Sequence, residues 1–533
     1  MAALGDRDRA VGFESVDPVA RASSAEDLAP RLAEVVGAFS LAADLGLGQP
    51  MEHGLRSCLI ATRLAERLDV DAGVRDCTYW VSLLAMVGCT AESFEIRDVF
   101  GDDIALRRGM YDLGPSQVAQ ARYFVSRAGS DGGLLRRARS AAGLVVTGMR
   151  SVVETLVADC EVTARFAERL GLGAAVSDAL QQKFTRWDGK GVPSGVAGQD
   201  IPFAARVLAV AWRVEAEHRL RGVDAALALA KRHAAATLDP ELVALLEAAG
   251  PEILGELGEE SWEAVVAAEP PRARLTAAAF DDALEALGDF ADLKSPWFTG
   301  HSRSVAELSQ AAAGHLGLSE RDVTLLRRAA LVHSLGRAGI PNTIWDKPGP
   351  LTFSERERLQ LYPYLTERIL RRGSLTRFAA IASASQERLD GSGYPQGLAG
   401  AAMTVSRRVL ASADAYRAMC EPRPHRLAMS AEEAAKQLRT EAKAGRLDGQ
   451  AAEAVLAAAG HTPKRRQAAP ADLTSREVEV LRLIARGCTS AGAARELGIQ
   501  TKTVGTHIEH IYAKIGASNR SAATLFAMEH GLA

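Results

Sequence analysis

The sequence predicts an all-α protein, with two tandem helical bundles followed by a small four-helix module. Apolar residues recur three and four positions apart along most of the chain, as at Leu325, Ala329 and Val332, whereas alternating period-2 runs are scarce. A length of 533 residues fits about three domains at roughly 100–200 residues each. Hydrophobic residues at 47% and charged residues at 24% are typical of a folded protein and exclude wholesale disorder.

The net charge of −3 is the sum of two unlike parts. From Lys464 to the end there are 10 Lys and Arg against 6 Asp and Glu, a net of +4. The rest of the chain holds 53 basic and 60 acidic residues, a net of −7. A short basic module therefore follows a larger acidic body, and we expect the basic module to be the part that meets nucleic acid.

Cysteine usage and the N-terminus point to the cytoplasm. The six cysteines include no C-x-x-C pair and no zinc-site spacing, which is typical of reduced, mostly buried thiols. The first residues are charged where a signal peptide needs an apolar core. No run of about 18 apolar residues occurs, so we expect no membrane contact.

Clusters of proline and polar residues divide the chain. One break falls at Glu269–Arg272 and another, basic and extended in character, at Thr462–Pro470. The expected segments are a flexible N-terminal arm over 1–30, a first domain over 31–268, a second over 274–460, a basic linker over 461–471 and a C-terminal module over 472–533.

The first two domains read as copies of one another. His53 aligns with His301 at an offset of 248, and residues 83–88 lie on 331–336 at the same offset. At an offset of 202, residues 188–208 match 390–410 with 10 identities in 21 positions. We call these domains the first and second repeats, and we expect each to bury a core of its own.

The second repeat resembles the HD-GYP family of metal-dependent cyclic-dinucleotide phosphodiesterases. The resemblance covers about 276–425 and depends on His301, on His333 with nearby Gly336, on Glu387 before the block Asp390–Pro395, and on Asp414. It implies that both repeats have the helical HD-domain fold. It also implies a centre in which two metal ions activate water for phosphodiester hydrolysis.

Only part of the family's ligand set is present. His301, His333 and Asp414 match three of seven ligand positions, and Arg337 stands where a functional lysine is usual. The replaced positions are Ser334, Tyr362, Ser385 and Gln386. Without the bridging carboxylate that Ser334 replaces, a two-metal centre lacks the anion it needs. We expect no cofactor and no two-metal hydrolysis, and at most a single divalent metal held weakly by the three surviving residues.

The first repeat departs further from the family. His53 matches, but the other ligand positions carry Ala85, Met86, Lys183, Phe184 and Trp212. We expect apolar side chains to occupy this centre, with Trp212 and Met86 in the core and no metal.

The glycine-rich loop that survives in both repeats has two interpretations. In the structural one, its glycines adopt positive φ and its proline stiffens a turn between helices. In the functional one, its backbone approaches a phosphate-bearing ligand, with Gly391, Gly393, Tyr394 and Pro395 forming a ligand loop.

The C-terminal module reads as four short helices. Thr474 and Glu477 form a capping box that opens the first helix, which ends at Gly487. The second runs from about Ser490 to Leu497, the third carries an apolar stripe at Val504, Ile508, Ile511 and Ile515, and the fourth runs from about Asn519 to Glu529.

This module resembles the LuxR-type DNA-binding domain. The matching residues are the Leu473–Leu481 start, Thr503-Val504 with His507, and the Lys514–Arg520 end. The resemblance implies a helix-turn-helix that binds double-stranded DNA as a homodimer on a pseudo-palindrome. The residues expected to line the DNA are Lys502, Thr503, Thr506, His507 and Lys514.

Two departures from the LuxR pattern bear on affinity. Gly492 and Ala493 replace the usual residues of the second helix, and Gly505 lies inside the third, where glycine costs roughly 1 kcal/mol of helix propensity. We expect DNA binding with modest affinity or altered sequence preference.

Three functions are compatible with this organisation. The favoured one is a transcription regulator whose degenerate HD-GYP-like repeats sense a ligand, such as a nucleotide, or mediate oligomerisation. The first alternative is an active phosphodiesterase fused to a DNA-binding domain and using His301, His333 and Asp414. The second is a protein-interaction module.

Overall fold

The computed structural model describes residues 30–110, 117–130, 132–147, 150–255, 257–258, 261–460 and 470–533. Over these ranges the chain is all-α as predicted, with isolated β-bridges and no strand. The predicted N-terminal arm and most of the predicted linker lie outside them. None of the described helices is both long and apolar enough to span a membrane.

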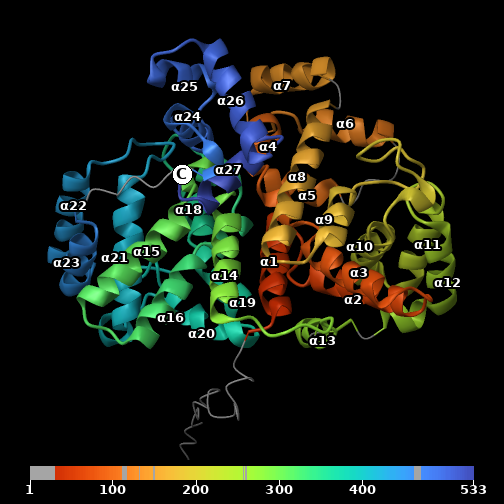
Figure 1. Cartoon of the computed structure of the whole chain (residues 1–533), viewed down its shortest axis with the longest axis horizontal. Coiled ribbons are helices and arrows are strands. Elements are labelled where there is room, and N and C mark those ends of the chain that lie inside the picture. Colours follow the sequence, from red (N-terminus) through yellow and green to blue (C-terminus); the bar gives the residue numbers. More distant parts are fainter. Residues whose placement is uncertain are drawn as a thin grey trace, which may run out of the picture.

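The first repeat consists of helices arranged around α1, α2, α3 and α10 (Figure 1). Its helices are α1 (Leu32–Gly46), α2 (His53–Glu66), α3 (Ala72–Leu84), α4 (Ser93–Phe100), α5 (Asp103–Met110), α6 (Gln117–Arg127), α7 (Leu134–Thr147), α8 (Arg150–Arg169), α9 (Ala174–Gln181), α10 (Phe203–Arg221), α11 (Val223–His233), α12 (Pro240–Leu254) and α13 (Ser261–Ala267).

The second repeat reuses the same order of central helices. α14 corresponds to α1, α15 to α2, α16 to α3 and α21 to α10. Its helices are α14 (Ala277–Asp292), α15 (His301–His315), α16 (Glu320–Leu331), α17 (Asn342–Trp345), α18 (Phe353–Leu359), α19 (Tyr362–Leu370), α20 (Thr376–Ala382), α21 (Val405–Cys420), α22 (Ala431–Lys443) and α23 (Gly449–Ala458).

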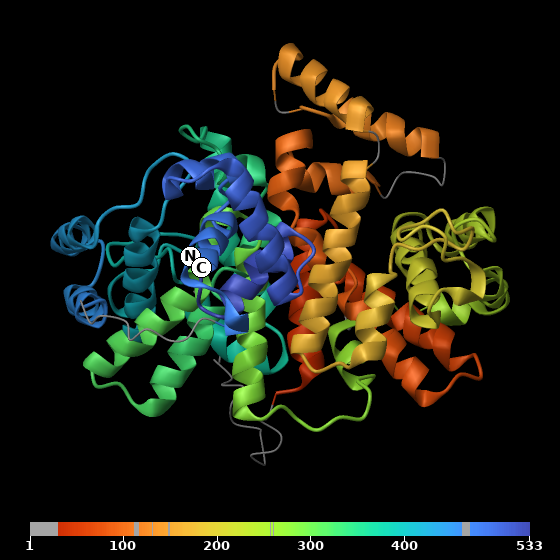
Figure 2. The same cartoon turned by 45° about the horizontal axis from the view of Figure 1, so that its top comes forward.

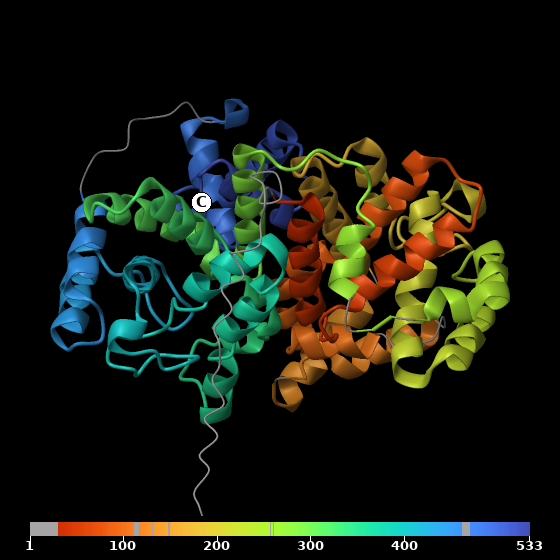
Figure 3. The same ribbon diagram turned by 90° about the horizontal axis from the view of Figure 1, so that it is seen from below.

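The two repeats share one large apolar core, and the first repeat has in addition a separate apolar cluster among α2, α10, α11 and α12, so the prediction of a separate core for each holds only in part. Helices α1 and α14 lie side by side at the centre of the molecule, as Figures 1 and 3 show. Phe39 of α1 meets Phe290 of α14 with ring centroids 5.5 Å apart. The buried apolar side chains of both helices belong to one continuous cluster. Each repeat thus covers apolar surface that the other would leave in water.

The C-terminal module has the predicted four helices: α24 (Ser475–Ala485), α25 (Ser490–Leu497), α26 (Thr501–Ile515) and α27 (Arg520–Glu529). The predicted capping box is present, with Thr474 and Glu477 each accepting a hydrogen bond from the other's backbone N–H. α26 continues through Gly505 without a break. The module has a small core of its own, and Figure 2 shows it seated on the body between the two repeats.

Candidate functional site

His301, His333 and Asp414 meet at one buried point in the second repeat. His301 is the first residue of α15, His333 follows the end of α16, and Asp414 lies in α21. One potential ligand atom from each residue lies within 4.8 Å of the others. All three side chains are buried. The three surviving positions that the sequence singled out are therefore brought together.

Asp414 is at the centre of a hydrogen-bonded network. Its Oδ1 lies 2.9 Å from Nε2 of His301 and 3.4 Å from Nε2 of His333. Its Oδ2 accepts a hydrogen bond from the side-chain amide of Gln386. The Oγ of Ser334, at the position where the family has an aspartate, lies 3.1 Å from His333 Nε2.

A hydrogen-bond acceptor at Nδ1 of each histidine orients the two imidazoles. His301 Nδ1 lies 2.8 Å from a carboxylate oxygen of Glu421, and His333 Nδ1 donates to the carbonyl oxygen of Ala330 at 2.6 Å. Sequence reasoning missed Glu421. It lies seven residues after Asp414, directly beyond the end of α21, where the backbone is extended, so helical spacing gives no signal for it.

The charges of the network are uneven. Burial opposes protonation of His301, but the carboxylates of Glu421 and Asp414 outweigh it and raise the pKa of this histidine. Burial lowers the pKa of His333. Burial alone would raise the pKa of Asp414, yet the two histidines hold it well below its usual range. The surroundings therefore favour the protonated form of His301, between two carboxylates, and the neutral form of His333.

This donor set fits one metal ion and does not fit two. Two imidazole nitrogens and one carboxylate are a recognised transition-metal ligand set, and both imidazoles already have the outer acceptors that orient metal-bound histidines. Binding would require His301 to lose a proton and Gln386 to release Asp414. Tyr362 is instead buried against Trp345, with ring centroids 5.6 Å apart. Ser334 has no carboxylate to bridge a second ion.

The glycine-rich loop is organised by Glu387. Its buried carboxylate accepts hydrogen bonds from the backbone N–H groups of Gln396 at 2.7 Å and Leu398 at 2.8 Å. Gly391 has φ +80°, and a side chain at Gly393 would collide with the backbone of Glu387 and Arg388. These contacts give the loop glycines a structural role.

The loop also reaches the histidine site. The hydroxyl of Tyr394 lies 3.3 Å from Oε1 of Gln386, whose amide in turn donates to Asp414. Among the four predicted loop residues, Tyr394 is the one whose side chain is linked to Asp414, and the Gln386 side chain bridges the two.

The corresponding centre of the first repeat contains a buried ion pair. The Lys183 ammonium donates to Asp159 and to Thr163, each at 2.7 Å. Both members of the pair are buried. The prediction of an entirely apolar centre is therefore wrong, because a lysine charge lies there with its counter-ion. Trp212 is buried as predicted and packs on His53 with ring centroids 4.2 Å apart, while Met86 is half-buried.

The predicted DNA-lining residues differ in their surroundings. Lys502, Thr503 and Thr506 are exposed at the start of α26, and His507 is half-buried. Lys514 instead donates to Glu477 of α24 at 2.7 Å, so its charge is engaged within the module.

Two family models match parts of the chain. Residues 158–242 and 285–451 match the model of the HD domain, and residues 471–527 match that of the bacterial regulatory proteins of the luxR family.

Individual relatives are phosphodiesterases. The chain is 29% identical over 413 residues to 3'3'-cGAMP-specific phosphodiesterase 3 of Vibrio cholerae, covering 76% of this chain and 89% of that protein. It is 40% identical over 118 residues to the cyclic di-GMP phosphodiesterase response regulator RpfG of Xanthomonas campestris, covering 21% of this chain and 31% of the relative.

A solved structure supports the same relationship. The crystal structure of a cyclic GMP-AMP-specific phosphodiesterase from V. cholerae superposes with a TM-score of 0.57 at 25% identity, covering 82% of this chain and all of that one. The chain thus contains an HD domain and a C-terminal domain of the luxR family of bacterial regulatory proteins, and it is similar to cyclic-dinucleotide phosphodiesterases.

Proposed function

We propose that this chain is a DNA-binding transcription regulator in which the start of α26 enters the major groove. The observation that carries the proposal is the division of this helix into two faces. Val504 and Ile511 are buried in the module, whereas Lys502, Thr503 and Thr506 are exposed. Lysine and hydroxyl groups at the start of a recognition helix reach phosphates and base edges. Two copies on a pseudo-palindromic site are the expected arrangement.

DNA selection with the full-length protein tests this proposal. Duplexes retained from a random-sequence pool are measured by fluorescence anisotropy against the wild type, Lys502→Glu and Lys436→Glu. Lys436 is an exposed lysine of α22, on the second repeat, and gives the same charge change away from the module. We expect weaker binding for Lys502→Glu alone. Equal binding by both variants would refute the assignment of α26.

We propose that the second repeat binds a ligand and does not carry out two-metal hydrolysis. Both oxygens of Asp414 already have partners within the protein, in His301 and Gln386. The ligand class suggested by the relatives is a cyclic dinucleotide. Thermal-shift measurements with 3'3'-cGAMP and cyclic di-GMP test this, since a ligand that binds only the native state raises the melting temperature.

Residual phosphodiesterase activity is the second candidate. It is favoured by the three converging donors and by the relatives' printed activities. A single metal at His301, His333 and Asp414 would supply a Lewis acid for a phosphoryl oxygen. Metal analysis and cyclic-dinucleotide turnover with manganese or iron distinguish the candidates, with Asp414→Asn as control. Turnover that disappears in this variant would establish the enzyme, and two metals per chain would contradict the one-ion limit.

A further inference from the structure

The first repeat contains a basic segment within a stretch that is longer than its counterpart in the second repeat. Between the two aligned blocks the offset falls from 248 to 202, so the first repeat is 46 residues longer there. Helices α6 and α7 lie in this stretch. Residues 117–150 contain six arginines and one aspartate, a net charge of +5, and without them the acidic body carries −12. The body is therefore itself divided into a basic segment and a more acidic remainder.

Arginine side chains of this α6–α7 segment are on the surface. Arg122 of α6 and Arg137 and Arg139 of α7 are exposed. Arg150, the first residue of α8, is instead paired with Glu154 at 3.0 Å. Exposed guanidinium groups concentrated in one segment attract an anionic partner.

Helix α8 links the α6–α7 segment to the C-terminal module. α7 packs against α8, which begins at Arg150. Eleven residues later, Glu161 accepts hydrogen bonds from the backbone N–H of Ser518 at 3.0 Å and from the amide of Asn519 at 2.7 Å. These two residues follow the end of α26. A rise of 1.5 Å per residue places the two ends of this link about 16 Å apart along α8.

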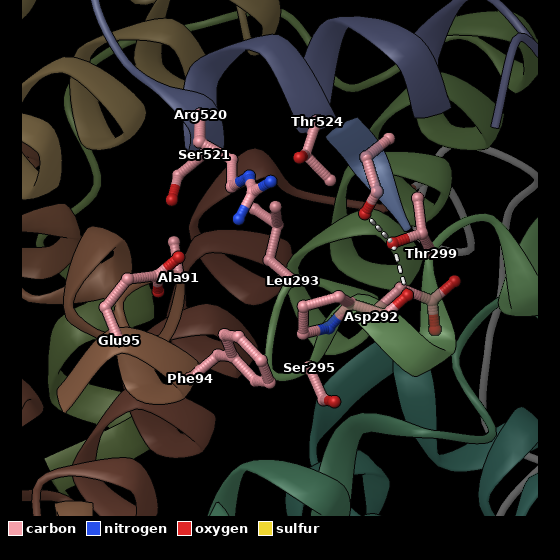
Figure 4. Close-up of a pocket in the computed structure, with 12 residues that line it drawn as sticks. Ala91, Phe94, Glu95, Asp292, Leu293, Ser295, Thr299, Arg520, Ser521 and Thr524 are labelled. Atoms are coloured by element: carbon pink, nitrogen blue, oxygen red, sulfur yellow. Dashed lines mark hydrogen bonds between the residues drawn. The ribbon is translucent and has the colours of Figure 1, made fainter. Parts of the chain in front are cut away.

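Contacts with both repeats hold the module in this position. Leu525 and Met528 of α27 belong to the continuous core of the two repeats. The hydroxyl of Thr299 donates to the carbonyl oxygen of Ala485, at the end of α24, at 3.0 Å. Figure 4 shows Thr299 and Thr524 of α27 lining one pocket between the second repeat and the module. The position of α26 relative to the α6–α7 segment is therefore set by packing.

The α6–α7 segment and α26 reach the same edge of the molecule. Both lie at the upper edge in Figure 1, and Figure 2 shows α6 and α7 projecting from the rest of the first repeat. Phosphates follow one another every 3.4 Å along each strand of a duplex, so about 16 Å corresponds to about five base pairs. A duplex held by α26 would bring its flanking phosphates to the segment.

We propose that the α6–α7 segment is a second DNA-contact surface, at which Arg122, Arg137 and Arg139 bind phosphates beside the sequence that α26 recognises. The inference rests on the proposed DNA binding by α26. It adds contacts that position the protein on the duplex without reading bases. The segment, at +5, continues the positive charge of the C-terminal end, at +4, whereas the remainder of the body repels phosphates.

Anionic phospholipid is the other polyanion whose charge fits this segment. Val118 and Leu135 are 79% and 89% exposed, and apolar side chains beside arginines are also typical of helices that lie on a membrane surface. The shared helix α8 and the shared edge with α26 favour DNA. Vesicles of anionic phospholipid therefore give the contrary outcome of the test.

The test measures the full-length chain by fluorescence anisotropy against two duplexes over a range of salt concentrations. One duplex contains only a sequence selected from the random pool, and the other adds about 10 base pairs, one helical turn, on each side. One variant combines Arg122→Ala, Arg137→Ala and Arg139→Ala. For the longer duplex, its slope of log affinity against log salt concentration should fall by about 0.9–1.8, which corresponds to one or two phosphate contacts. Arg137 and Arg139 lie two positions apart and so face different sides of α7. The shorter duplex should show no change.

Three basic residues of the second repeat provide a control with the same loss of charge. Arg321→Ala, Lys436→Ala and Lys443→Ala replace exposed residues of α16 and α22, away from the shared edge (Figure 1). This control should bind both duplexes as the wild type does. Equal slopes for the wild type and the arginine variant on the longer duplex would overturn the proposal, and so would an equal fall on both duplexes. An arginine variant that keeps the wild-type slopes but loses binding to the vesicles would assign the segment to a membrane surface instead.

Lys502→Glu distinguishes this surface from α26. If this variant loses DNA binding while the arginine variant keeps the wild-type slope, α26 is supported and the second surface is refuted. If the slope falls in the arginine variant while Lys502→Glu binds like the wild type, the assignment of α26 is refuted and the second surface stands. A wild-type chain that binds neither duplex refutes both.

Discussion

The two lysines of α26 should affect DNA binding differently. Lys502 lies exposed in the first turn, and none of the ion pairs in the described ranges involves it. Lys514, at the other end of the helix, is paired with Glu477 at 2.7 Å and also donates to the carbonyl oxygen of Asp472 at 3.1 Å. Replacing each by alanine therefore separates a lysine free to meet a phosphate from one that joins α26 to α24.

The magnitude follows from counter-ion release. Each phosphate contact contributes about 0.9 to the slope of log affinity against log salt concentration. When the salt concentration rises fourfold, the factor by which DNA affinity falls should be about 3.5 times smaller for Lys502→Ala than for the wild type. Lys514→Ala should leave the slope unchanged and lower the free energy of unfolding by about 1 kcal/mol or less, because the lysine is about a third exposed (35%).

Fluorescence anisotropy with one selected duplex at several salt concentrations measures both slopes, and chemical denaturation measures stability. Lys436→Ala serves as the control for loss of a lysine elsewhere. If Lys502→Ala and Lys514→Ala reduced the salt dependence of DNA binding equally, the claim that the Glu477 ion pair keeps Lys514 from the DNA would be refuted. The prediction from the sequence that both lysines line the DNA would then stand.

Two further predictions concern buried charge. Lys183→Met leaves Asp159 buried without its counter-ion and should lower the free energy of unfolding, measured by chemical denaturation, by about 3–5 kcal/mol. Adding Asp159→Asn should restore part of this stability. A loss below about 1 kcal/mol would contradict a buried pair. Burial and then the Glu95 carboxylate raise the pKa of Glu92 to about 8, with Asp159 acting in the same direction and a hydrogen bond with Ser521 and the charge of Arg107 opposing it. Because a carboxyl whose pKa is raised in the folded chain is penalised once it ionises, the free energy of unfolding should fall as pH rises from about 4.5 to about 8, which chemical denaturation at several pH values measures. Glu92→Gln should remove this pH dependence, and an unchanged pH profile in that variant would exclude Glu92 as its source.

Residues whose roles are set locally were predictable. The capping box at Thr474, the helix Ser490–Leu497 and the three surviving ligand positions all depend on spacing within one short segment or on a motif kept in register. The duplication was visible for the same reason, because two copies of one pattern align without any knowledge of packing.

Partners across the fold were not predictable from spacing alone. Lys183 was identified as a replaced ligand, but its counter-ion Asp159 comes from a different helix, 24 residues earlier. Gln386 was read as a lost ligand, whereas its amide occupies the free oxygen of Asp414. The partner that a residue at a replaced ligand position finds depends on which side chains the packing of the helices places next to it.

The sequence by itself determined the all-α class, the repeat, the three residues that converge in the second repeat and the helices of the C-terminal module, since each depends on periodicity or on motifs. Only the tertiary structure decided that the repeats share a core, that Lys514 pairs with Glu477 and that α27 lies in the body. These contacts join segments far apart in the chain. Their energies come from surfaces and charges that exist only once the helices are packed, so no local pattern encodes them.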